Sequence, residues 1–141
     1  MEVKNKSKVN IFLIELIIVI LIFAISAAII VNLFAAASKV NRESHDKTVS
    51  LMKIESIIEE YKSFEYAIEG NNYLESLSFP KLYDKDWLET TDETNAVYSI
   101  VLISSQKKYG SGSVFTLDLT SIEKDNGKEL IKLKGSKYFY Q

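Results

Sequence analysis

The chain contains a run of 23 residues without a charged side chain, Leu16–Ser38, in a sequence of 141 residues. All 17 Lys and Arg and all 19 Asp and Glu lie outside this run. A helix over the run is roughly 34 Å long, which is enough to cross the ~30 Å hydrocarbon core of a bilayer. We therefore expect a basic leader at residues 1–10, followed by a transmembrane helix at residues 11–37.

A cleaved secretory signal is the alternative interpretation of the same run. The tripeptide Ala35–Ala37 has the small residues that signal peptidase favours, and cleavage there would release a secreted domain. The apolar region of an ordinary signal is only about 7–15 residues long. The length of this run therefore favours a retained membrane anchor.

Basic residues flank both ends of the apolar run, so the positive-inside rule alone does not fix its orientation. The flanks contain Lys4, Lys6 and Lys8 on one side, and Lys39, Arg42, Lys47 and Lys53 on the other. The N-terminal tail is very short, and long domains translocate largely regardless of charge. We expect a single-pass membrane protein, with its N-terminus inside and its C-terminal domain outside.

The rest of the chain is long enough for one small domain with a modest core. There is no cysteine, which excludes disulfides and thiolate metal sites. The formal net charge of −2 argues against a general nucleic-acid binder. No catalytic constellation, phosphate-binding loop or zinc signature is present, so we expect neither an enzyme nor a cofactor or small-molecule substrate.

Residues 38–69 are predicted to continue the helix, because apolar residues recur there at steps of three and four. These residues are Leu51, Ile54, Ile57, Ile58, Tyr61 and Phe64. Gly70, which is followed by two asparagines, is the predicted stop signal. Gly70–Thr94 contains the only proline and the only tryptophan and is predicted to be a connecting loop.

Three strands are predicted in the remainder, at Ala96–Ser104, Ser113–Ile122 and Glu129–Lys134. In the second, Phe115, Leu117 and Leu119 share one face, as in a half-buried strand. Asn126-Gly127 favours a hairpin with a type I′ turn. The predicted fold class is α+β, with the amphipathic half of a long helix packed on a small antiparallel sheet of about three strands in residues 70–141.

The run from Ile11 to Ile20 resembles the N-terminus of type IV pilins and of the pseudopilins of type II secretion and competence systems. In that family a short basic leader precedes an apolar helix with one glutamate near its start. Leu13-Ile14-Glu15-Leu16 is identical to the family's typical motif at these positions. The resemblance covers about twenty positions in detail. The layout of a helix whose second half packs on a sheet is similar over the whole chain.

Glu15 is the residue to which the resemblance gives a role. A carboxylate at the centre of a bilayer costs about 2.5–3.5 kcal/mol, so a charge in an apolar span is a candidate for function. The resemblance implies that Glu15 pairs with the free α-amine of a neighbouring subunit and sets register during assembly. From the residues alone, Glu15 could instead snorkel toward water or Lys8.

The resemblance also implies cleavage by a prepilin peptidase between Asn10 and Ile11, methylation of the new N-terminus, and contact with an assembly platform protein. The family has glycine where this chain has Asn10, phenylalanine at Ile11 and threonine at Phe12. We therefore expect inefficient cleavage or an unprocessed, anchored subunit. Anchoring and filament packing would rest on Phe12, Leu13, Ile14, Leu16, Ile17, Ile18, Val19 and Ile20.

Three other groups of residues are candidate sites. His45 is the only histidine and has no cysteine partner, so a metal role is not expected. Glu123, Asp125 and Glu129 could hold Ca²⁺, but acidic residues are ordinary in turns. Four lysines and three aromatic residues at the C-terminus have the chemistry to bind single-stranded DNA, but an edge strand protected by lysines is the preferred interpretation.

The resemblance thus implies a minor pilin-like or pseudopilin-like subunit in a bacterial cytoplasmic membrane, which acts by assembly with other pilin-like subunits. Its surface loop Gly70–Thr94 would carry the partner contacts. The alternative is a single-pass, membrane-anchored extracytoplasmic binding domain that never enters a filament.

Overall fold

The computed structural model describes residues 3–140, with side-chain environments from residue 11 on. The chain divides into two compact units, one up to Glu43 and one from Ser44 on. Helix α1 (Val3–Ser63) forms the described part of the first unit and the beginning of the second. It is followed by α2 (Ala67–Ser76), β1 (Lys81–Tyr83), β2 (Glu89–Thr90), β3 (Tyr98–Tyr109), β4 (Gly112–Glu123) and β5 (Lys128–Tyr140).

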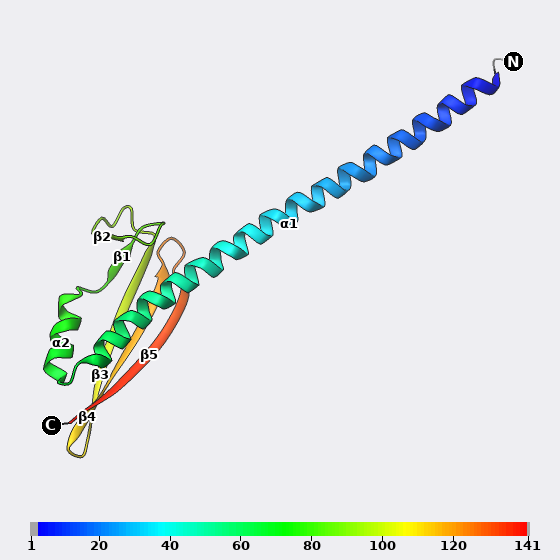
Figure 1. Cartoon of the computed structure of the whole chain (residues 1–141). Coiled ribbons are helices and arrows are strands. Elements are labelled where there is room, and N and C mark those ends of the chain that lie inside the picture. The colour runs from blue at the N-terminus through cyan, green and yellow to red at the C-terminus, as the bar shows by residue number, and fades with distance from the viewer. Residues whose placement is uncertain (1–2, 141) are drawn as a thin grey trace. The chain divides into compact units, whose positions relative to one another are not determined.

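The strands form one antiparallel sheet of order β2-β1-β3-β4-β5, and the last part of α1 lies along it (Figure 1). The predicted α+β class is confirmed, but the sheet has five strands rather than about three. The two additional strands, β1 and β2, lie in the segment predicted as a loop. They are three and two residues long, which is too short for an alternating pattern to be recognised.

The core of the second unit lies between α1 and one face of the sheet. On α1 the buried residues Ile54, Ile57, Ile58 and Tyr61 are at most 7% exposed, which confirms four of the six predicted positions. Leu51 is only partly buried, and Phe64 lies beyond the end of α1. On β4, from Ser113 to Ile122, the odd-numbered residues are buried and the even-numbered ones are only partly buried, as predicted. Burial of these apolar side chains is the main favourable term in the folding of this unit.

The prediction that the helix continues to residue 69 is wrong. Helix α1 ends at Ser63, and Tyr66 has extended backbone angles before α2 begins. Gly70 is not a stop signal, because it lies inside α2 and faces Tyr61. A Cβ at Gly70 would come within 2.8 Å of Cε2 of Tyr61. The glycine therefore permits α2 to fold back closely onto α1, which is a tertiary requirement rather than a helix end.

The predicted hairpin at Asn126-Gly127 is present, but its turn is different. Glu123 pairs with Lys128, so four residues form the loop, and Gly127 N–H donates to the carbonyl of Glu123 at 2.9 Å. Only Gly127 has a positive φ there, whereas a type I′ turn needs two such residues. Asn126 instead accepts a hydrogen bond from the N–H of Lys128 at 2.8 Å.

Strand β5 contains a register shift opposite Ser121 and Ile122, and the extra residue, Leu130, is buried. A bulge of this kind turns additional side chains toward the core. Farther along β5, Gly135 allows close contact with α1, since a Cβ there would lie 2.5 Å from Cγ2 of Ile58.

Candidate functional site

The apolar segment of α1 is the most unusual surface of the chain. Every large apolar side chain from Ile11 to Phe34 is between 45% and 76% exposed. By length and composition this helix could cross a membrane. Contiguous exposed apolar surface of this extent marks a site for lipid or for another protein. The predicted anchoring residues, from Phe12 to Ile20, all belong to this surface.

Glu15 lies within the apolar segment, one helical turn after Ile11. Four residues of helix correspond to a rise of about 6 Å, and residues four apart lie on the same face. The Glu15 side chain is exposed, like its apolar neighbours. The backbone of Asn10 and Ile11 is helical, but the side chains of Lys8 and Asn10 are not among those that the structure describes. Two expectations therefore stay predictions. They are the processing site at Asn10 and Ile11, and the approach of Glu15 to Lys8.

A buried polar contact lies in the second unit, where sequence reasoning did not expect one. Trp87 Nε1 donates a hydrogen bond of 3.1 Å to Oδ1 of Asp46. The indole ring of Trp87 stacks on Tyr98, with centroids 4.2 Å apart and planes at 7°. Trp87 and Asp46 are 4% and 9% exposed. The segment predicted as a partner-binding loop therefore contributes its tryptophan to the core.

The loop before Trp87 is organised by Asp84. The Asp84 carboxylate accepts hydrogen bonds of 2.9 Å from the backbone N–H groups of Asp86 and Leu88. Trp87 itself has a φ of 61°, which is uncommon for a large side chain. Asp84 thus closes a tight loop that holds the indole inward.

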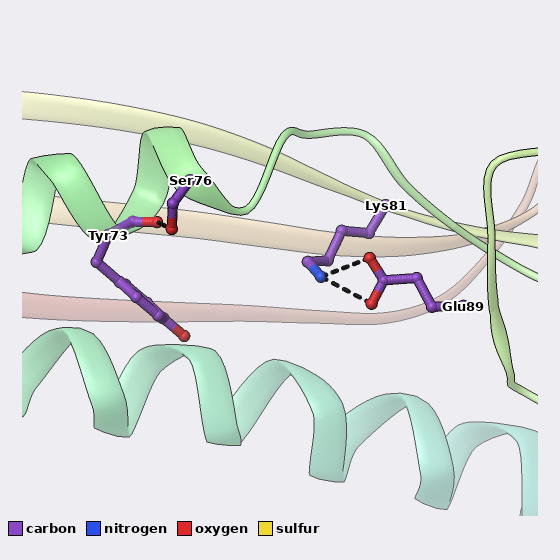
Figure 2. A network of polar contacts seen from close by, with 4 residues as sticks. All are labelled: Tyr73, Ser76, Lys81 and Glu89. Carbon is purple, nitrogen blue, oxygen red and sulfur yellow. Dashed lines mark hydrogen bonds and ion pairs between the residues drawn. The ribbon is translucent and has the colours of Figure 1, made fainter.

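The hairpin of β1 and β2 is held by an ion pair between a largely buried lysine and an exposed glutamate. Lys81 Nζ contacts both carboxylate oxygens of Glu89 at 2.8 and 2.9 Å (Figure 2). The nearby Tyr83 is buried, and this burial, with a smaller effect of the Glu89 charge, raises the pKa of Tyr83 to about 12.

Helix α2 is held to α1 by a side-chain hydrogen bond. The Tyr73 hydroxyl of α2 donates to Oε2 of Glu60 on α1 at 2.8 Å.

The C-terminal lysines contact groups of the protein itself. Lys132 and Lys134 lie 3.5 and 3.6 Å from the two carboxylate oxygens of Asp118. Lys137 Nζ donates to the backbone carbonyls of Lys62 and Phe64, at the C-terminal end of α1. A cation at this end of a helix is favourable, because the carbonyls there have no intrahelical partner. This arrangement gives Lys137 a structural role that the sequence did not reveal.

The side chains considered as metal ligands are arranged as turn and surface residues. Oε2 of Glu123 accepts a hydrogen bond of 2.9 Å from Nδ2 of Asn126. His45 is exposed on α1 beside the buried Asp46. The described residues contain no group of three His, Cys, Asp or Glu side chains placed to hold a metal ion.

An open cleft of about 640 Å³ lies between α2 and the sheet. It is lined by Asn71, Leu74, Glu75, Ser78, Phe79, Leu102, Ser104, Ser105, Gln106 and Phe115. No local sequence pattern predicts this cleft, because its walls come from segments about thirty residues apart.

Comparison with known proteins does not assign the chain to a family. The chain matches no protein-family model, and neither the curated proteins nor the solved structures contain a significant match to it.

Proposed function

We propose that the protein is a minor pilin-like or pseudopilin-like subunit, anchored in the membrane by residues 11–37 and acting by assembly with similar subunits. The observation that carries the proposal is the continuous exposed apolar surface from Ile11 to Phe34 around its one acidic residue. Such a surface needs lipid while the subunit is stored and protein neighbours when it assembles.

Glu15 is the residue that separates assembly from simple anchoring. An anchor alone gains nothing from a carboxylate in an apolar helix, since the charge opposes insertion. In a filament the carboxylate would pair with a cationic group of a neighbouring subunit, and the low dielectric around the pair would favour one axial register. The small domain built on residues 44–140 would then face away from the helical core.

The test uses the full chain in its native host with Glu15→Gln, which removes the charge and keeps the shape. Ser26→Ala is the matched control, because Ser26 is polar, lies in the same apolar segment, and bonds only the carbonyl of Ile22, at 2.9 Å, in its own helix. We expect both variants to stay in the membrane fraction. Glu15→Gln should lose cross-linking to filament subunits, and Ser26→Ala should keep it.

Two results would contradict the proposal in different ways, and a third measurement decides the state of the leader. If mass spectrometry of the membrane-extracted protein finds Met1 on every molecule, the leader is retained and the proposal holds for an unprocessed subunit only. If Glu15→Gln cross-links like the unchanged protein, the chain is a tethered extracytoplasmic domain rather than a filament subunit. A chain that begins after Ala37 would indicate a secreted domain instead.

A further inference from the structure

Strand β3 has a free edge over most of its length. Strand β1 pairs with only its first three residues, Tyr98–Ile100, whereas β4 pairs with all of it. Within residues 3–140, no strand pairs with the other side of residues 101–109. Unpaired backbone groups on an edge are a template for the addition of another strand.

The hydrogen-bond pattern identifies which groups are available on this edge. The N–H of Lys124 donates to the carbonyl of Val97 at 2.8 Å, and the register from there to the hairpin is unbroken. Odd-numbered residues of β3 therefore bond to β4. The even-numbered residues direct both their N–H and C=O groups to the free side, and they are Leu102, Ser104, Gln106 and Lys108.

The cleft described above runs along this same edge. Side chains of Leu102, Ser104 and Gln106 line it on the sheet side, and residues of α2 line it on the other side. Phe115 and Leu74 give it apolar contacts. A single extended segment needs only the ~4.8 Å spacing of one further strand. The edge of a second sheet would also bring neighbouring strands against α2, so the cleft favours one segment over a second copy of the sheet.

The charges at the end of the edge favour an acidic segment. Lys107 and Lys108 are both exposed, and neither pairs with a carboxylate among the described residues. Lys107 lies over the ring of Tyr109 instead, with Nζ 5.2 Å from its centroid. Glu75 of α2, in contrast, places a carboxylate on the helix side of the cleft. An acidic residue of a bound segment is therefore best placed beside Lys108.

We propose that the free edge of β3 and the cleft beside α2 bind an extended peptide segment of a partner protein, which adds to the sheet as a sixth strand. The segment runs antiparallel to β3, since antiparallel pairing is the slightly more stable form. It has apolar residues at alternate positions facing the cleft and an acidic residue in its N-terminal part, beside Lys108. This inference does not depend on filament assembly.

The experiment selects binders from a displayed library of random twelve-residue peptides, using the full chain in lipid nanodiscs. The selected peptides are then titrated against Gln106→Pro, which removes one outward N–H without touching the bonds to β4. Ile103→Thr is the control, because Ile103 lies on the opposite face of β3 and is 66% exposed. Near-ultraviolet circular dichroism verifies that each variant is folded.

We expect enriched peptides with alternating apolar residues and an acidic N-terminal part. Gln106→Pro should weaken their binding about fivefold or more, as expected for one lost hydrogen bond, and Ile103→Thr should not. Lys108→Glu, which does not alter the backbone, should weaken binding and reduce its dependence on salt. Enrichment without this pattern, or binding unaffected by Gln106→Pro and Lys108→Glu, would overturn the proposal. So would an effect of these variants on self-association alone, which would identify a second copy as the occupant.

Discussion

The indole N–H of Trp87 donates to the carboxylate of Asp46 across 41 residues of sequence, in the interior of the second unit. Asp46 lies on α1, and Trp87 lies in the loop between β1 and β2. The contact therefore fixes the small hairpin against the helix. It also lowers the cost of burying the Asp46 carboxylate, since a buried polar group is most costly when it has no hydrogen-bond partner.

Loss of this hydrogen bond should destabilise the domain. Asp46→Ala leaves the indole N–H buried without an acceptor, so we expect the free energy of unfolding to fall by about 1–3 kcal/mol. Asp46→Asn retains an acceptor oxygen and should lose less. His45→Ala is the control, because His45 is adjacent but exposed, and a change within about 0.5 kcal/mol is expected. Urea denaturation of the full chain in detergent, followed by tryptophan fluorescence, measures all three. Equal losses for Asp46→Ala and His45→Ala would contradict the assignment.

The close approach of β5 to α1 at Gly135 makes a second prediction. Gly135→Ala places a methyl group 2.5 Å from Cγ2 of Ile58, so we expect a loss of about 1–3 kcal/mol from overpacking. The double variant with Ile58→Ala should lose less than the sum of the two single variants, because the cavity accepts the methyl group. Ser136→Ala, at an exposed position of the same strand, is the control. Strictly additive losses would show that the contact is not the cause.

Lys137 is expected to stabilise the end of α1. Lys137→Met keeps the aliphatic stem but removes the donor to the carbonyls of Lys62 and Phe64, and we expect a loss of about 1 kcal/mol. Hydrogen exchange should become faster in the last turn of α1 and in the link to α2. Lys134→Met, whose lysine is exposed at the surface, should leave that exchange unchanged. Unaltered protection in Lys137→Met would refute the capping role.

The stability of the domain should fall at alkaline pH. Burial raises the pKa of Tyr83 to about 12, and it raises the pKa of Tyr61 as well. Because the folded state favours the neutral phenol, this contribution is fully present below the unfolded-state pKa of about 10 and is lost as pH rises from there toward 12. Tyr83→Phe should flatten the decline of stability over this range. Tyr66→Phe, which changes an exposed tyrosine, should leave the slope as it is. Thermal melts of the two variants and the unchanged protein, taken about one pH unit apart from pH 9 to pH 12, measure these slopes.

The second unit should fold without the apolar segment, since its core is formed by residues from Ser44 on. A fragment that begins at Lys39 is expected to melt cooperatively in water without detergent and to stay out of the membrane fraction. The full chain should need lipid or detergent to stay in solution. Aggregation of the fragment in water would show that residues before it contribute to the core.

The sequence by itself determined the features that depend on local periodicity. The uncharged run fixed the apolar helix, the three- and four-residue spacing fixed the buried face of Ile54, Ile57, Ile58 and Tyr61, and the alternation in β4 fixed which face of the sheet is buried. These patterns repeat over many residues, so each position supports the same conclusion. The role of Glu15 rests on a short resemblance and stays a proposal.

Only the tertiary structure decided where α1 ends, which close contacts require Gly70 and Gly135, and that Trp87 donates a hydrogen bond to Asp46. No proline or glycine marks the end of α1 between Ser63 and Tyr66, and the chain turns there because α2 packs on Tyr61 and Lys137 binds the last carbonyls. The free edge of β3 is likewise invisible in sequence, since it exists only because β1 stops after three pairs. Contacts between distant residues depend on space and hydrogen-bond geometry in the folded chain, and no local pattern encodes them.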